Sequence, residues 1–292
     1  MSDQAAPGGL IGVGVGPGDP ELMTVRAVRV VREAHRVLAP SSAIDAVGRA
    51  ESIVRQACPG ARIERLVFDM GEAAASIDEA AKTVVAGLDA GQRLAFVTLG
   101  DPNVYSTFSS VAARVRELRP RSVIETVPGI MAFQELASRS GTVVLQNTER
   151  LALITALDGP AALDGALGDP TEAVVVYKGG RHLPAMAKRL AAAGRLDGAV
   201  VGELLGLPGE QIGPVADAAE SPAAYLATLI VPPVNRKSDL REAQKGRPDR
   251  RIGEQSELDP SELESSRPEA DDAVRRAELA GRAELAGRAE RA

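Results

Sequence analysis

The sequence predicts an α/β fold with two domains, each built on a mainly parallel or mixed sheet, followed by a disordered C-terminal tail. Apolar segments of strand length alternate with segments of helical periodicity, an order typical of sheets covered by helices. The strand segments are continuous apolar runs, as expected for parallel strands buried on both faces. After residue 233 the chain has no aromatic residue, and charged residues, serine and proline dominate.

The first expected domain, residues 1–127, begins with an apolar strand and continues with alternating helices and strands. Its expected strands are Leu10–Val15, Arg36–Ala39, Ile63–Phe68, Arg93–Thr98 and Ser122–Thr126. Its expected helices are Pro20–Ala34, Ala73–Ala90 and Val104–Leu118. Apolar residues at helical spacing support the first of these helices.

The second expected domain, residues 128–233, begins at a Pro-Gly turn and has the same alternating character. Its expected helices are Ile130–Ser140 and Leu183–Ala193, and its expected strands are Leu151–Ala156, Ala173–Tyr177, Ala199–Glu203 and Tyr225–Val231. Two successive prolines, Pro232 and Pro233, end the last strand, since proline donates no ladder hydrogen bond.

The remaining segment, residues 234–292, is predicted to be a disordered charged tail. It cannot bury enough apolar surface to offset its chain entropy. Near its end Ala277–Arg282 repeats directly as Ala283–Arg288, with residues that favour a helix. The glycine in each repeat costs about 1 kcal/mol in a helix interior, so we expect transient helix at most.

The composition narrows the classes of function. Hydrophobic residues make up 45% of the chain, but no apolar run reaches the roughly 18–20 residues of a membrane span. The polar start, Met1–Gly9, does not resemble a signal peptide, so we expect a cytoplasmic protein. One cysteine, Cys58, with His35 and His182 offers too few ligands for a zinc cluster, and no metal site is expected. The net charge of −6 argues against nucleic acid as a partner, and no membrane partner is expected.

Four glycines alternate with other residues after the first strand, at Gly12, Gly14, Gly16 and Gly18. Glycine tolerates close approach of other atoms to the backbone, so the pattern predicts something bulky against this turn. It does not match the dinucleotide fingerprint, which requires G-x-G-x-x-G. No Gly-Lys-Ser/Thr follows, so a P-loop is excluded as well.

Four loops follow predicted strands, at residues 16–19, 98–108, 125–130 and 176–181. Each alone has an ordinary structural explanation, and the Gly-Asp-Pro of the first two is a common turn between a strand and a helix. Ligands of open α/β sheets bind at the carboxyl ends of the strands. The four loops together therefore predict a binding site at that edge.

The order of these motifs, G-x-G-x-G-P-G-D-P-x-L-x-T, then G-D-P-x-x-Y and V-P-G-I, resembles the tetrapyrrole (corrin/porphyrin) methyltransferases over residues 10–233. The resemblance implies two α/β domains with a ligand cleft between them, S-adenosyl-L-methionine as methyl donor, and a homodimer. The stretch Gly100–Phe108 is similar to the branch that methylates precorrin-2 at C20, giving precorrin-3A in cobalamin (vitamin B12) biosynthesis. Precorrin-2 is then the expected partner.

Other acceptors and other functions stay open at this point. The cofactor motifs do not decide between C20 and another corrinoid position, or between precorrin-2 and cobalt-factor II. From a different class, the loops are also compatible with a nucleotide or small-ligand binding module without catalysis. A scaffold that acts through its tail is a third alternative.

The resemblance also implies which residues contact the cofactor. The contacts come from Pro17, from the backbone of the second loop, from residues just after the Pro-Gly turn, and from two positions at which relatives often carry another residue. In relatives the position of Lys178 is often methionine, so the contact there is expected from the aliphatic stem of the lysine, and the position of Leu205 is often glycine. The expected cofactor-binding residues are Pro17, Leu99, Gly100, Asp101, Val104, Met131, Ala132, Lys178 and Leu205.

Four further residues are expected on the substrate side. In the family the position of Asp19 faces the tetrapyrrole, so it is the expected acid/base or substrate-orienting group. Tyr105 is assigned to the cleft because aromatic residues are scarce and it follows Gly-Asp-Pro directly. Arg150 and Arg181 are expected to bind acetate or propionate groups by bidentate pairing. Methyl transfer from a sulfonium depends mainly on positioning, and no Ser-His-Asp or Cys-His set is seen.

Overall fold

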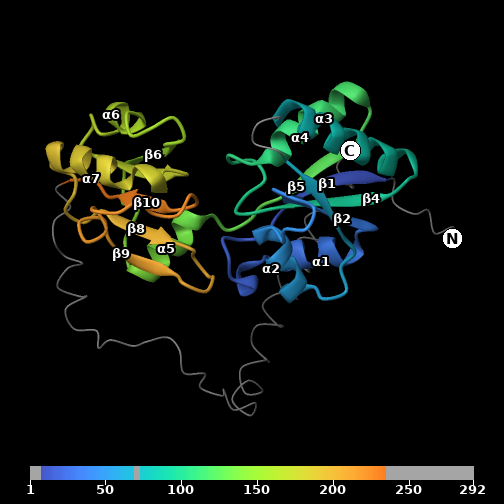
Figure 1. Ribbon diagram of the computed structural model, residues 1–292, viewed down its shortest axis with the longest axis horizontal. Helices are drawn as coiled ribbons and strands as arrows, with labels where there is room; N and C mark the ends of the chain where they lie inside the picture. Colours follow the sequence, from blue (N-terminus) through green and yellow to red (C-terminus); the bar gives the residue numbers. More distant parts are fainter. Residues whose placement is uncertain (1–7, 69–72, 235–292) are drawn as a thin grey trace, which may run out of the picture. The chain divides into compact units, whose positions relative to one another are not determined.

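The computed structural model describes residues 8–68 and 73–234, which form two sheets flanked by helices (Figure 1). The prediction of a disordered tail falls on residues 235–292, which lie outside the described residues. No helix in the described ranges is long and apolar enough to cross a membrane.

The first sheet is fully parallel and has helices on both faces. Its strands, in the spatial order β3-β2-β4-β1-β5, are β1 (Gly9–Gly14), β2 (Arg36–Ser41), β3 (Ile63–Val67), β4 (Arg93–Thr98) and β5 (Ile124–Val127). Helices α1 (Val25–Glu33) and α2 (Arg49–Ala57) cover one face, and α3 (Ala73–Asp89) and α4 (Thr107–Leu118) cover the other (Figure 1). A short 3₁₀ helix, η1 (Pro20–Leu22), precedes α1.

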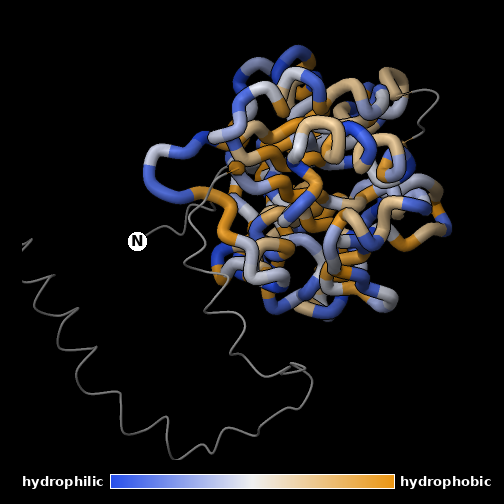
Figure 2. The backbone as a smooth tube through the Cα atoms, turned by 90° about the vertical axis from the view of Figure 1, so that its left-hand side faces the viewer, coloured by the Kyte–Doolittle hydropathy of each residue, from blue (hydrophilic) through white to orange (hydrophobic). Residues whose placement is uncertain are grey.

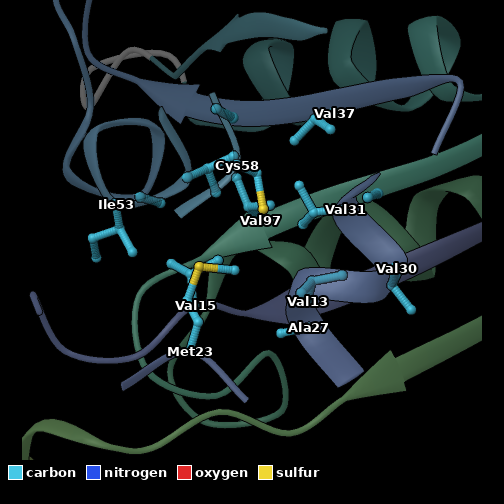
Figure 3. Close-up of a cluster of buried hydrophobic side chains, with 14 of the residues drawn as sticks. Val13, Val15, Met23, Ala27, Val30, Val31, Val37, Ile53, Cys58 and Val97 are labelled. Carbon is cyan, nitrogen blue, oxygen red and sulfur yellow. The ribbon is translucent and has the colours of Figure 1, made fainter. Parts of the chain in front are cut away.

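The core of this sheet follows the period-two alternation of its strands. In β4, Leu94 and Phe96 pack with α3 and α4, whereas Val97 packs with α1 and α2. Figure 3 shows the core on the side of α1 and α2. There Val97 lies among aliphatic side chains from strands and helices, including Ile53 of α2. Because both faces are buried, the strands read as continuous apolar runs.

The second sheet is mixed. Its strands, in the order β6-β7-β10-β8-β9, are β6 (Arg150–Thr155), β7 (Glu172–Tyr177), β8 (Val200–Glu203), β9 (Gln211–Pro214) and β10 (Thr228–Val231). Only the pair β6–β7 is parallel. Helix α5 (Ala132–Ser140) packs on one face, and α6 (Ala162–Ala166) and α7 (Leu183–Ala192) pack on the other, with η2 (Gly180–His182) leading into α7.

The predicted α/β fold class is confirmed, and each expected strand is present within a few residues of its predicted ends. The expected helix Pro20–Ala34 is divided, because Met23 and Thr24 are extended and the Thr24 hydroxyl accepts from Ala27 N (3.1 Å) to start α1. Helices α2 and α6 and strand β9 were not predicted. The domain boundary at residue 128 stays a prediction.

Figure 2 shows the distribution of hydropathy over the described residues. Hydrophobic segments lie mostly in the interior of the fold, and hydrophilic segments lie mostly at its surface.

Three glycines bring the carboxyl ends of β1, β4 and β5 into direct backbone contact. A Cβ atom on Gly14 would lie 2.6 Å from Gly129 N, and one on Gly129 would lie 2.7 Å from the Gly14 Cα. Both would also overlap the carbonyl oxygen of Gly100. Gly100 N donates to Gly16 O (3.0 Å), which joins the first two loops. Any side chain at Gly14 or Gly129 would therefore push these loops apart.

We expect Gly129→Ala to destabilise the protein by about 1–3 kcal/mol, because backbone atoms cannot move aside as a flexible side chain can. Gly165→Ala in α6 is the matched control, since a Cβ there meets nothing within 4 Å. Removing glycine from that helix should be neutral or stabilise by up to about 1 kcal/mol. Urea unfolding measures the stability of both variants. Equal stability of the two would contradict the close backbone contact at Gly129.

A buried carboxylate ties α2 to β3. The side chain of Glu51 is fully buried and accepts from Arg65 Nε (2.6 Å) and Arg55 Nη2 (2.6 Å). Arg65 also donates to Ile44 O (2.7 Å) in the loop after β2. The hydrogen bond from Arg65 is the main reason that the pKa of Glu51 lies below its ordinary value, against the opposing effect of burial.

Because the folded-state pKa of Glu51 is lowered, its stabilisation is present above the ordinary glutamate pKa of about 4.3 and is lost as the pH falls below it. We expect Glu51→Gln to lower the midpoint of thermal unfolding at pH 7 by about 5 °C. The difference from the parent protein should narrow toward about pH 3. Glu79→Gln, at an exposed ion pair with Lys82, is the control. A difference in unfolding midpoint between Glu51→Gln and the parent protein that does not change with pH would contradict a stabilising role for the Glu51 charge.

Candidate functional site

The predicted site residues lie on loops at the carboxyl ends of strands. Because β1, β4 and β5 are adjacent and parallel, the loops at residues 15–19, 99–106 and 128–131 leave the first sheet at the same edge. In the second sheet, β7 and β8 are both antiparallel to β10, which lies between them. The loops at residues 178–182 and 204–206 therefore share one edge of that sheet as well.

The residues of the first three loops that are expected to contact a cofactor are partly exposed to solvent. They are all half-buried, and they are Pro17, Leu99, Gly100, Asp101, Val104, Met131 and Ala132. Gly100 has φ +62°, and a Cβ there would meet only Met131 Cα, at 3.9 Å. The backbone therefore leaves open space beside Gly100 and Met131.

The side chain of Asp101 is occupied by the loops themselves. Its two carboxylate oxygens accept from Asn103 N (2.8 Å) and from Gly129 N (3.1 Å). The carboxylate thus fixes the second loop to the third. The expected contact of Asp101 with a cofactor is through its backbone, and that contact stays a prediction.

Asp19 caps the short helix η1. Its Oδ1 accepts from Glu21 N (2.8 Å), and no residue of the described ranges donates to Oδ2. The loop also lies against the turn after β8, since a Cβ on Gly206 would lie 3.1 Å from Asp19 Cα. Oδ1 of Asp19 thus stabilises the turn, and Oδ2 has no hydrogen-bond donor among the described residues.

Leu205 contributes its backbone to the first loop and its side chain to the core. A Cβ on Gly18 would lie 2.9 Å from the carbonyl carbon of Leu205. The Leu205 side chain packs with Leu136, Val175 and Ile230 between α5 and the second sheet. An expected cofactor contact at Leu205 would accordingly come from its backbone.

Tyr105 connects the second loop to β6 and β7. Its hydroxyl donates to Leu153 O (2.7 Å), and its ring makes an edge-to-face contact with Tyr177 at 6.4 Å between centroids. Its φ of +48° is unusual for a residue with a side chain. The hydroxyl is thus used by the β6 backbone, and the expected role of Tyr105 on the substrate side stays a prediction.

Lys178 completes this connection from the end of β7. Its Nζ donates to Tyr105 O (3.0 Å), and its own φ is +58°. The side chain is half-buried, and burial lowers the pKa of its ammonium group.

The two arginines expected to bind carboxylates differ in position. Arg150 is the first residue of β6, at the amino end of the strand, and pairs with Asp169, so it does not lie at the loop edge. Arg150 therefore lies at the opposite end of β6 from the loops, and its expected role in binding a carboxylate stays a prediction. Arg181 lies in η2 beyond the carboxyl end of β7, where it donates to Leu157 O (2.7 Å) and His182 Nε2 (3.0 Å).

Two residues near the loops were missed. Tyr177 accepts from Phe133 N (3.2 Å), and burial raises the pKa of its hydroxyl to about 12. Gln134 caps the start of α5 by accepting from Met131 N (2.8 Å). The scarcity of aromatic residues could have indicated Tyr177, and the spacing of a capping residue could have indicated Gln134.

Two cavities lie elsewhere. One, of about 540 Å³, lies beside the ends of α1 and α2, and the other, of about 310 Å³, lies between α4 and β5. None of the predicted cofactor or substrate residues lines either of them, so the cleft between domains stays a prediction. Within the described ranges, no group of three or more His, Cys, Asp or Glu side chains is placed to hold a metal ion.

Curated relatives share much of this sequence. The chain is 33% identical over 238 residues to the "Precorrin-2 C(20)-methyltransferase" of Sinorhizobium sp, covering 77% of this chain and 95% of that protein. It is 30% identical to the "Cobalt-precorrin-2 C(20)-methyltransferase" of Salmonella typhimurium, covering 77% and 96%. Cobalamin biosynthesis protein CobIJ of Mycobacterium tuberculosis is 32% identical, but the match spans only 48% of that longer protein and 81% of this chain.

Solved structures share the fold. The cobalt precorrin-4 methyltransferase CbiF has a TM-score of 0.59 at 19% identity, covering 76% of this chain and 94% of CbiF. Uroporphyrin-III C-methyltransferase of Thermus thermophilus, complexed with S-adenosylhomocysteine, has a TM-score of 0.56 at 21% identity, covering 77% and 97%. At these identities the likeness concerns the fold alone.

The family model for tetrapyrrole (corrin/porphyrin) methylases matches residues 9–219, which include both sheets apart from β10. With this match and the loop arrangement described above, the chain belongs to the tetrapyrrole (corrin/porphyrin) methylase family.

Proposed function

We propose that the chain transfers a methyl group from S-adenosyl-L-methionine to C20 of precorrin-2, giving precorrin-3A in cobalamin biosynthesis. The observation that carries this proposal is the match, at 33% identity, to 95% of the Sinorhizobium protein named for that activity. A homodimer stays a prediction of the family resemblance, and a cytoplasmic location stays a prediction from the sequence.

The loops fit the methyl donor in their chemistry. The open space beside Gly100 and Met131 borders half-buried apolar groups, which suits a ligand with an adenine and an aliphatic amino-acid end. We assign contacts to Pro17, to the backbone of residues 99–101, to the side chain of Val104, to Met131 and Ala132, and to the Leu205 backbone. A Thermus relative with this fold has been solved with S-adenosylhomocysteine, the demethylated donor.

The protein's part in the reaction is to position the acceptor and manage one proton. S-adenosylmethionine supplies the methyl group as an electrophile already activated by its sulfonium charge. When the carbon–carbon bond forms, C20 loses its proton. We assign the orientation of the ring, or acceptance of that proton, to Oδ2 of Asp19, because Oδ1 already caps η1.

A cobalt-containing acceptor is the second candidate. The Salmonella relative is named for cobalt-precorrin-2, and the match covers 96% of it at 30% identity. Its identity to this chain is close to that of the Sinorhizobium protein, so the acceptor has to be decided by experiment.

The deciding experiment incubates the purified chain with methyl-labelled S-adenosylmethionine and either enzymatically generated precorrin-2 or its cobalt form. We expect a gain of one methyl group in precorrin-2, seen by mass spectrometry and a change in the visible spectrum, with the label at C20. Preferential methylation of the cobalt form would select the second candidate. Methylation at another carbon would contradict the C20 assignment, and failure to bind S-adenosylmethionine would leave a non-catalytic binding module.

Asp19→Asn tests the role of the carboxylate, because asparagine keeps the oxygen that caps η1 and removes only the charge. We expect turnover to fall by about 100-fold while the dissociation constant for S-adenosylhomocysteine changes less than about twofold. Asp19→Ala, which also loses the cap, controls for the shape of the turn. A large loss of cofactor binding in Asp19→Asn would contradict the substrate-side placement.

A further inference from the structure

Lys178 has more hydrogen-bonding capacity than the structure uses. An ammonium group has three N–H donors, and Nζ donates to one described acceptor, Tyr105 O at 3.0 Å. That acceptor is a neutral carbonyl, which does not compensate the charge. A half-buried cation in this condition is suited to a further, anionic partner.

Carboxylates of the chain itself do not provide that partner. Among the described residues, no Asp or Glu oxygen lies within 4.0 Å of Lys178 Nζ. In contrast, the half-buried arginines on the strands of the first sheet, Arg36, Arg65 and Arg93, each have a carboxylate in contact. Burial lowers the pKa of the Lys178 ammonium group. Arg181, three residues further, also has no carboxylate partner in the described ranges.

The backbone holds Lys178 in a demanding conformation. Lys178 and its acceptor Tyr105 both have positive φ, at +58° and +48°, although neither is glycine. Such conformations are costly, persist where the surroundings enforce them, and cluster at ligand sites. The chain thus positions this ammonium group where the loops after β4 and β7 meet.

We propose that Lys178 is a carboxylate-binding residue, whose ammonium group keeps one donor on Tyr105 O and gives the others to a carboxylate of the bound ligands. This inference rests on the proposed function and deepens it, since both reactants carry carboxylates. The donor has one on its amino-acid end, and the tetrapyrrole has several acetate and propionate groups. The contact is through the charged nitrogen, not through the aliphatic stem.

The experiment compares Lys178→Met, Lys178→Gln and Lys178→Arg with the parent chain. Glutamine can still donate to Tyr105 O but has no charge, and arginine keeps the charge. Lys188→Met on the exposed face of α7 is the control for loss of a lysine. Calorimetry gives dissociation constants for S-adenosylhomocysteine and for 5′-methylthioadenosine, which lacks the carboxylate, and kinetics give the KM for precorrin-2. Thermal melts check that each variant is folded.

We expect the Met and Gln variants to lose about tenfold or more in one of these affinities, and the Arg variant to retain most of it. Loss for S-adenosylhomocysteine without loss for 5′-methylthioadenosine identifies the carboxylate of the donor. Unchanged donor affinity with a raised KM for precorrin-2 identifies a carboxylate of the acceptor.

Three results would overturn the assignment of Lys178: no change in any affinity, a Gln variant that behaves like the parent chain, or equal losses for both nucleoside ligands. Unchanged affinities would show that Lys178 contacts no ligand. A Gln variant like the parent chain would show that only the hydrogen bond to Tyr105 O matters. Equal losses for both nucleoside ligands would show that the substitution disrupts the loops. A parent chain that binds no S-adenosylhomocysteine would instead refute the proposed function itself.

Discussion

The close approach of the backbones at Gly14, Gly100 and Gly129 is the constraint on which the loop edge depends. Parallel pairing brings the ends of β1, β4 and β5 to one edge, but only the absence of side chains lets the three loops touch. The contact places the Asp101 carboxylate within hydrogen-bonding distance of Gly129 N and the Gly100 amide within reach of Gly16 O. The half-buried residues between these bonds are thereby held where a ligand can reach them.

Charge is distributed unevenly over the described residues. In the first sheet, Glu51 is fully buried with two arginines, and this cluster serves the packing of α2 against β3. At the end of β7, Lys178 and Arg181 donate only to uncharged acceptors. An ion pair satisfied within the fold adds stability, whereas an unsatisfied cation at the loop edge adds the capacity to bind an anion.

Much of the fold could be predicted because its signals are local. Strand β4 begins and ends where predicted, since its apolar run follows Gly91, Gln92 and Arg93 and is ended by a Gly-Asp-Pro turn. Helix α2 follows Gly48, which gives no side-chain cap, and β9 is short with Gly213 and Pro214, so neither has a strong local signal. The site needed non-local information. The glycines of the first turn were expected to face something bulky, and the structure places other parts of the chain there: the Phe108 ring at Gly12 and the Leu205 backbone at Gly18.

The contact between the turn at Gly18 and the Leu205 backbone joins main chain to main chain. Such a contact requires only that side chains be absent at Gly18 and at Gly206, where a Cβ would overlap the backbone of Asp19. Neighbouring positions are therefore free to diverge while the path of the chain is kept. This gives a physical basis for a fold shared at about 20% identity by proteins named for different tetrapyrroles. Side chains on a loop edge of this kind can be substituted without rebuilding the scaffold that holds them.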